Sequence, residues 1–226
     1  SMSPDVSNPA ARDITYDSLY DAYLEQIDAL IEGGVDALLI ETIFDTLNSK
    51  AAVDAAMTAM HSRGVELPLM LSVTVSDLAG RTLSGQSLSA YLASVSTYPI
   101  FSIGLNCSFG ARQMLPFLKE LAAQAPYYIS AYPNAGLPNS LGLYDETPDT
   151  MAPQIAEFID TGLVNIVGGC CGTTEKFIER YVALVRGRAP HNPAPRPQTM
   201  WLSGLDLLNV TPEVRFVNVG ERCNVA

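Results

Sequence analysis

Five short apolar runs, separated by segments of helical periodicity, constrain the fold of this chain most strongly. They are residues 37–40, 69–75, 101–105, 127–131 and 164–167. Each run is rich in Ile, Val, Leu or Tyr and too short for a typical helix, and the runs recur about every 30 residues, the length of a βα unit. Near-continuous apolar strands that alternate with amphipathic helices predict an α/β fold, with a parallel sheet covered by helices.

The segments between these runs predict the helices. They are residues 17–34, 46–64, 87–96, 111–124, 150–162 and 173–188. Gly33, Gly34 and Gly64 stand where a glycine commonly ends a helix. A (β/α)8 barrel of the TIM type has eight βα units in about 250 residues. We therefore expect residues 1–188 to form the later part of such a barrel, with about five units and without the first three strands.

The pattern changes after Arg188. Residues 189–198, "APHNPAPRPQ", are proline-rich and typical of an interdomain linker. Residues 216–219 look like one more strand. We expect residues 189–226 to hold the linker and the first strand of a truncated second domain. The alternative is a C-terminal extension that packs on the outside of the first domain.

Composition limits the classes of partner. The formal net charge is -11, with 24 acidic against 13 basic residues. This balance disfavours nucleic acid and anionic membrane surfaces, which attract positive charge. No apolar run approaches the roughly 18 residues of a membrane span, and the first residues carry no signal-peptide pattern. Only four cysteines occur, two of them adjacent, so a disulfide framework is a poor explanation and a reducing, cytoplasmic location is expected.

Three of the four cysteines follow predicted strands. Cys107 follows the third run, and Cys170 and Cys171 follow the fifth. In parallel α/β folds the carboxyl ends of the strands share one rim, so these thiols are expected to meet there. Three thiols without a fourth protein ligand suit a catalytic zinc site, because such a site leaves one position open. The histidines, His61 at a helix end and His191 in the linker, are not placed to complete it.

Other readings of the same cysteines stay open. A lone buried cysteine is usually a small hydrophobic residue, and Cys170 with Cys171 would also serve as a structural or redox dithiol without turnover. Cys223 has no partner in the sequence, and we assign it no role.

The other residues at the predicted rim are polar. They are Glu41, Thr42, Asp45, Thr74, Asp77, Arg81, Gln86 and Asn134. Several of these residues also have a purely structural interpretation. Glu41 would be an ordinary carboxylate at a strand end, Asn134 a turn residue, and residues 77–86 a solvent-exposed loop. Gly168 and Gly169 are expected to let the backbone turn tightly enough for adjacent thiols to face one ion. Thr173 and Thr174 are expected to start a helix whose N-terminal dipole favours thiolate charge.

"GLNC" followed by "GGCCGT" resembles the zinc signature of the homocysteine S-methyltransferase family. "IETIFDTLNSKAA" and "YPNAGLPN" extend the resemblance over most of the first 190 or so residues. The tail "FVNVGERCNVA" resembles the opening strand of a pterin-binding, folate-binding module. That module follows the homocysteine module in the branch of the family that uses cobalamin, whereas members that use betaine or S-methylmethionine lack it.

The resemblance implies a function. Cys107, Cys170 and Cys171 would be the zinc ligands, Asn134 would lie near the open coordination position, and Glu41 would help to bind the amino group of homocysteine. Zinc would activate the homocysteine thiol, and methylation would give methionine. Cobalamin and 5-methyltetrahydrofolate would be bound by other modules of the same enzyme. Two alternatives stay open: a non-catalytic metal-binding or strand-exchanging fragment that self-associates through open sheet edges, and a homocysteine methyltransferase that uses betaine or S-methylmethionine.

Overall fold

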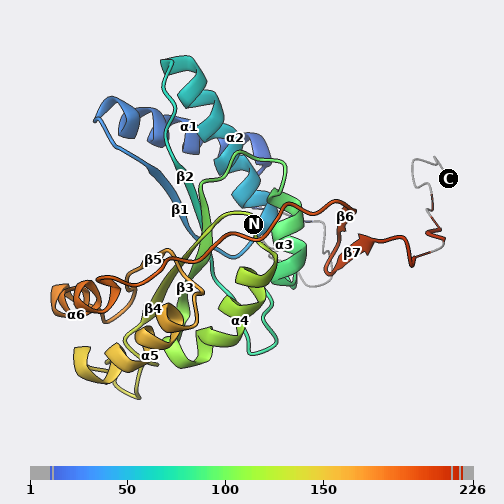
Figure 1. Cartoon of the computed structure of the whole chain (residues 1–226). Coiled ribbons are helices and arrows are strands. Elements are labelled where there is room, and N and C mark those ends of the chain that lie inside the picture. Colours follow the sequence, from blue (N-terminus) through green and yellow to red (C-terminus); the bar gives the residue numbers. More distant parts are fainter. Residues whose placement is uncertain (1–10, 12, 215, 219, 221–226) are drawn as a thin grey trace.

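A computed structural model describes residues 11, 13–214, 216–218 and 220, and its centre is a five-stranded parallel sheet in the order β1-β2-β3-β4-β5 (Figure 1). The strands are β1 (Leu38–Ile43), β2 (Leu69–Val73), β3 (Ser102–Gly110), β4 (Tyr128–Asn134) and β5 (Ile166–Val167). Neighbours in the sheet are neighbours in sequence, as in consecutive βα units of a barrel. This confirms the predicted fold class, a sheet consistent with part of a TIM-type barrel.

Six helices complete the described βα units. They are α1 (Tyr16–Glu32), α2 (Thr46–Arg63), α3 (Leu88–Val95), α4 (Ala111–Gln124), α5 (Pro148–Asp160) and α6 (Glu175–Val185). Local chemistry sets their ends: Asp45 caps α2 by accepting the backbone N–H of Asn48, and Gly64 ends α2 with φ 64°. Figure 1 shows the pairs α1 and α2, α3 and α4, and α5 and α6 following one another around the sheet.

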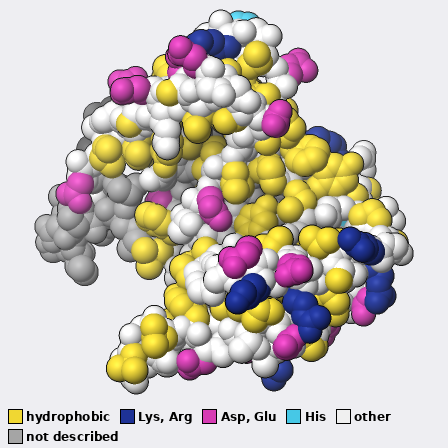
Figure 2. Space-filling view, turned by 90° about the vertical axis from the view of Figure 1, so that its left-hand side faces the viewer, with side chains coloured by type: hydrophobic (Ala, Val, Ile, Leu, Met, Phe, Trp, Pro, Cys, Tyr) yellow, Lys and Arg dark blue, Asp and Glu magenta, His cyan; other side chains and the backbone are white. Residues whose placement is uncertain are grey.

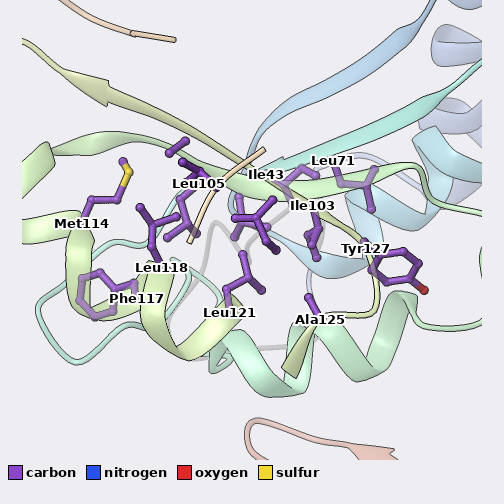
Figure 3. Close-up of a cluster of buried hydrophobic side chains, with 14 of the residues drawn as sticks. Ile43, Leu71, Ile103, Leu105, Met114, Phe117, Leu118, Leu121, Ala125 and Tyr127 are labelled. Carbon is purple, nitrogen blue, oxygen red and sulfur yellow. The ribbon is translucent and has the colours of Figure 1, made fainter. Parts of the chain in front are cut away.

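The main core lies between the sheet and these helices. In Figure 3, Leu71, Ile103 and Leu105 of the strands lie above Leu118 and Leu121 of α4. All five side chains are buried. Burial of an aliphatic side chain of this size contributes about 1.5–3 kcal/mol, so this layer accounts for much of the stability of the sheet.

The opposite face of the sheet is partly open. One layer of this face is Leu39, Met70, Ser102 and Tyr128, which are in register across four strands. Leu39 and Tyr128 are each 43% exposed, and the Tyr128 ring lies 5.1 Å from that of Phe101. Figure 2 shows hydrophobic side chains gathered across the middle of one face of the molecule. Within the described part of the chain, β1 and β5 each have one unpaired edge.

The predicted elements are found with shifted boundaries. β1, β3 and β4 run three to five residues beyond the apolar runs, because backbone pairing includes polar residues such as Asn106 and Asn134 and, in β1, resumes at Ile43 after an irregularity. β5 is shorter than predicted: Val164 is buried, but only Ile166 and Val167 pair with β4.

Residues 189–198 contain no helix or strand, yet they are held against the barrel residues, and we call them the strap. His191 N donates to Val164 O and Ala194 N donates to Ala125 O, so the strap crosses the amino ends of β5 and β4. The Asn165 side chain donates to His191 O, and His191 Nδ1 lies 2.8 Å from Gly162 O.

An antiparallel hairpin, β6 (Met200–Ser203) and β7 (Leu207–Val210), follows the strap and packs on α3. The sequence analysis did not predict it, although two apolar runs around a three-residue turn with Gly204 are typical of a hairpin. Residues 216–218 have no assigned strand, while Val219 and Cys223 lie outside the described residues, so the second-domain boundary stays a prediction. In the part that the structure describes, no helix is long and apolar enough to cross a membrane.

Candidate metal centre

Three thiols meet at the carboxyl ends of the strands. The Cys107 and Cys171 sulfurs are 3.7 Å apart, the Cys170 and Cys171 sulfurs are 3.9 Å apart, and all three lie within 4.8 Å of one another. Zinc–sulfur bonds of about 2.3 Å in a tetrahedron separate neighbouring sulfurs by about 3.8 Å. The donor set and its spacing therefore fit a metal ion such as zinc. No other group of His, Cys, Asp or Glu with this arrangement occurs among the described residues, and neither His61 nor His191 belongs to this group.

Left-handed backbone turns Cys107 toward the other two cysteines. Cys107 and Ser108 have φ values of 59° and 58°, and the pairing of β3 with β4 is irregular between Asn106 and Gly110. Non-glycine residues in this region are strained by about 1–3 kcal/mol, a cost that surrounding contacts offset. The backbone strain therefore lies at Cys107 itself, the first of the three cysteines in the sequence.

The glycines before Cys170 act by close packing rather than by the predicted turn. A Cβ on Gly168 would lie 2.8 Å from the Tyr132 ring, and one on Gly169 would lie 2.4 Å from Thr173 Oγ1. The left-handed glycine is Gly172, with φ 79°. Sequence reasoning therefore identified a glycine-dependent turn but not the glycine that makes it.

Asn134 lies beside the thiols, at the end of β4. Its side chain is 3% exposed, and Oδ1 accepts the backbone N–H of Cys171 at 3.1 Å. The main chain reinforces this link, because Ala135 N donates to Cys171 O and Cys170 N donates to Pro133 O. Asn134 thus orients the turn that carries two thiols, while its role at an open coordination position stays a prediction.

Asn106, which the sequence places at the end of the third strand beside Cys107, has a role that the sequence analysis did not predict. Its side chain is buried; Oδ1 accepts from Ser72 Oγ at 2.8 Å and Thr42 N at 3.2 Å, and Nδ2 donates to Thr42 Oγ1 at 2.9 Å. Thr42 is itself left-handed, with φ 59°. Asn106 therefore joins the ends of β1, β2 and β3 directly before Cys107. An amide in a buried strand is the available sequence signal, since buried polar groups require partners.

Tyr144 is a second residue found only in the structure. It comes from the loop between β4 and α5, and its ring packs so closely on Gly172 that a Cβ there would lie 2.5 Å from the Tyr144 side chain. A hydrogen bond with Cys171 raises the pKa of Tyr144. Nothing in the sequence marks this tyrosine, because its position depends on how the loop folds back.

The surroundings shift the pKa values of Cys170 and Cys171 in opposite directions. Burial, followed by the neighbouring Cys107 and Cys171, raises the pKa of Cys170 to about 12. Burial also acts to raise the pKa of Cys171, but hydrogen bonds from Tyr144, Cys107 and Cys170 bring it below its ordinary value. A bound cation would favour all three thiolates. Thr174 caps α6 without a side-chain hydrogen bond, and Thr173 Oγ1 instead donates to Cys170 O.

The remaining predicted rim residues are spread more widely. Glu41 is exposed on β1 and lines a cavity of about 220 Å³ with Tyr23, Thr42 and Asn48. Burial raises the pKa of Tyr132, and the Glu41 carboxylate adds to this increase. Glu41 is therefore on the open face of the sheet but is not one of the three metal-binding candidates.

Asp77, Arg81 and Gln86 have structural roles. Asp77 Oδ1 accepts the N–H groups of Ala79 and Arg81, while the Arg81 and Gln86 side chains bind the hairpin. None of the three belongs to the thiol cluster.

A parallel α/β sheet with a cluster of three thiols at its carboxyl rim is the arrangement of a candidate metal-binding protein. Comparison with known families matches residues 1–185 to the family described as homocysteine S-methyltransferase. The chain belongs to this family.

A solved structure shows the same fold. It is the apo form of the homocysteine methyltransferase MmuM from Escherichia coli, with a TM-score of 0.57 and 19% sequence identity. The match covers 76% of this chain and 57% of that chain, so the present chain spans little more than half of the protein that it resembles.

Proposed function

We propose that the protein activates the thiol of homocysteine, with zinc held by Cys107, Cys170 and Cys171, for a methyl transfer that yields methionine. The observation that carries this proposal is the cluster of three sulfurs within 4.8 Å of one another, with two of the pairs at 3.7 and 3.9 Å, in a chain of the homocysteine S-methyltransferase family. Zinc, when bound, would supply the positive charge that keeps a coordinating substrate thiol deprotonated at neutral pH.

The chain's own residues would position the substrate. Asn134 fixes the backbone of Cys171 and would border the open coordination position, while Glu41 would accept hydrogen bonds from the ammonium group of homocysteine. In the transfer, a bond forms between the substrate sulfur and the methyl carbon as the bond from that carbon to the donor breaks. Neutral thiols are weak nucleophiles, so holding the sulfur as thiolate is the chemical contribution of the site.

For the methyl donor we propose methylcobalamin, regenerated from 5-methyltetrahydrofolate on other modules, as in cobalamin-dependent methionine synthase. The sequence after the strap, "FVNVGERCNVA", supports this choice over betaine or S-methylmethionine, because it resembles the start of a folate-binding module. A cytoplasmic location would fit such an enzyme.

Zinc content tests the metal site. We expect about one zinc per chain in the wild-type protein and less than about a tenth of that in Cys107→Ala, Cys170→Ala and Cys171→Ala, since each loses one ligand. Cys223→Ala is the matched control, because it removes a thiol that is assigned no role. Homocysteine titration of the zinc-loaded protein then tests the open position. A wild-type chain without zinc, or full zinc in all three variants, would contradict the proposed site.

A second candidate is a self-associating, non-catalytic protein, and the open face of the sheet favours it. Leu39 and Tyr128 are each 43% exposed, and β1 has a free edge among the described residues. Exposed sheet edges readily pair with other chains. Sedimentation velocity across a concentration series distinguishes the readings: a dimer that dissociates in Leu39→Lys supports self-association, and a monomer at all concentrations opposes it.

A further inference from the structure

The hairpin β6–β7 is bound to the rim of the sheet by a set of polar contacts that the proposed chemistry does not use. Ser87 N donates to Leu205 O at 2.8 Å, and the Arg81 guanidinium donates to Asp206 Oδ1 at 2.8 Å. Ser203 Oγ donates to Ala90 O at 2.7 Å. The turn of the hairpin is therefore fixed to the loop between β2 and α3 at the carboxyl end of the sheet.

Gln86 is the centre of this attachment. Its Nε2 donates to Ser203 Oγ and to Gly204 O, both at 2.9 Å. Its Oε1 accepts from Thr46 Oγ1, in the first turn of α2. A single half-buried amide thus binds the C-terminal hairpin on one side and the segment that follows β1 on the other.

The segment after β1 leads directly to the candidate site. Phe44 O accepts from Ser84 N at 3.3 Å, so a second bond ties this segment to the loop that carries Gln86. Thr42, four residues before Thr46, is held by Asn106, which precedes Cys107. Glu41 directly precedes Thr42 in β1. Hydrogen bonds therefore link the hairpin through Gln86 to Thr46, and the backbone of residues 42–46 joins Thr46 to the end of β1 beside the candidate site.

We propose that Gln86 is a positioning residue through which the docked hairpin holds residues 42–46, and with them the homocysteine-binding side of the site, in place. The consequence for homocysteine rests on the proposed function, whereas the mechanical link between hairpin and loop does not. Thr42 has a left-handed backbone, and such a conformation persists only when its surroundings hold it. A brace at Thr46 serves that purpose without any contact between Gln86 and the thiols.

The experiment compares Gln86→Ala and Ser203→Ala with the wild-type chain. Ser203→Ala removes one of the two hairpin acceptors of Gln86 Nε2, leaves the other at Gly204 O, and changes none of residues 42–46. Gln124→Ala is the matched control, because the Gln124 amide also donates two hydrogen bonds, to Ser89 Oγ and Glu120 O, but on the outer helices. Hydrogen–deuterium exchange of residues 42–46 is the primary readout. Emission from Trp201, the single tryptophan, reports whether the hairpin is docked.

We expect exchange of residues 42–46 to rise about tenfold in both test variants and to stay at the wild-type rate in Gln124→Ala, because the side-chain link from the hairpin to this segment depends on one hydrogen bond, from Thr46 Oγ1 to Gln86 Oε1. Zinc content should stay unchanged, while homocysteine affinity falls about tenfold. The double variant should exchange no faster than Gln86→Ala, since both changes cut the same link.

A Ser203→Ala protein with a released hairpin, shown by a red shift of Trp201 emission, but with wild-type exchange of residues 42–46 would overturn the proposal. Faster exchange of residues 42–46 with unaltered homocysteine affinity would overturn the part of the proposal that concerns positioning of the substrate. If circular dichroism shows that Gln86→Ala does not fold, Ser203→Ala is sufficient as the test variant, because Ser203 is exposed. A wild-type protein that binds zinc but no homocysteine would contradict the proposed function, and the exchange rates would still decide whether the hairpin braces the loop.

Discussion

Replacing Asn106 by alanine tests whether the buried amide before Cys107 holds the candidate site together. The change removes the acceptor of Ser72 Oγ, at 2.8 Å, and both bonds to Thr42, at 3.2 and 2.9 Å. Asn106 is 1% exposed and Ser72 is fully buried, so water does not readily replace the missing partner of the hydroxyl. Stability and metal binding should both respond, because the same side chain joins three strand ends beside one thiol.

The magnitude follows from these three bonds. An unpartnered buried hydroxyl costs about 1–3 kcal/mol, and each hydrogen bond to Thr42 contributes a net of about 0.5–1.5 kcal/mol. Their sum is about 2–6 kcal/mol. The free energy of unfolding of a typical domain is about 5–15 kcal/mol, so the loss would be a large fraction of the total. We expect the free energy of unfolding to fall by at least about 2 kcal/mol.

Urea denaturation followed by circular dichroism measures this loss, with a chelator present so that metal binding does not mask it. Asn209→Ala is the control, because Asn209 is exposed in the hairpin and accepts one hydrogen bond, from Thr199. That variant should lose less than about 1 kcal/mol. A loss below about 1 kcal/mol in Asn106→Ala would refute the reasoning, since it would mean that the three bonds have no net effect.

Three further changes have defined outcomes. Gly172→Ala should lower the free energy of unfolding by at least about 2 kcal/mol in urea titrations, because φ is 79° and the new Cβ would lie 2.5 Å from Tyr144; a neutral effect would contradict that packing. Tyr144→Phe should shift the pH dependence of the alkylation rate of Cys171, in metal-free protein, to higher pH. In the wild type the hydrogen bond from Tyr144 lowers the pKa of this thiol, whereas burial raises it; an unshifted pH profile would exclude the bond. Arg63→Gln should be less stable than wild type at pH 7, and the difference should disappear as the pH falls below about 4. The hydrogen bond from Arg63 lowers the pKa of Asp28 in the folded protein. The stabilisation by this ion pair is therefore present above the pKa of Asp28 in the unfolded chain and is lost as the pH falls through its lowered pKa in the folded protein. Equal stability of the two proteins at pH 7 would contradict this reasoning.

The sequence predicts the sheet and the thiol cluster for the same physical reason. Apolar runs such as residues 69–75 have to be buried, and the carboxyl ends of parallel strands share an edge, so topology brings Cys107 and Cys171 to the same rim. Strand ends were predicted less well, since pairing extends into polar residues such as Asn134 that have no apolar signal.

Contacts made by loops and side chains were not predictable in this way. Tyr144 contacts Gly172 because its loop folds back onto the turn after β5. The hairpin is bound by Gln86, but the sequence of the loop that carries Gln86 is equally consistent with an ordinary solvent-exposed loop. Burial tells where a strand lies but carries no information on which loop side chain meets another. The prediction that Gly168 and Gly169 make the tight turn was wrong for a related reason, because backbone angles within a short glycine-rich segment depend on what packs against it.

The strap has a mechanical consequence. β5 pairs with β4 through two residue pairs only, yet Cys170 and Cys171 come directly after it. Tension applied at the carboxyl end of the chain would first load the hairpin on α3 and then the bonds from His191 and Ala194 to the amino ends of the strands. These bonds would have to break one after another before force reached the weakest strand of the sheet. The strap thereby shields β5, and the two cysteines that follow it, from force transmitted along the chain from the hairpin.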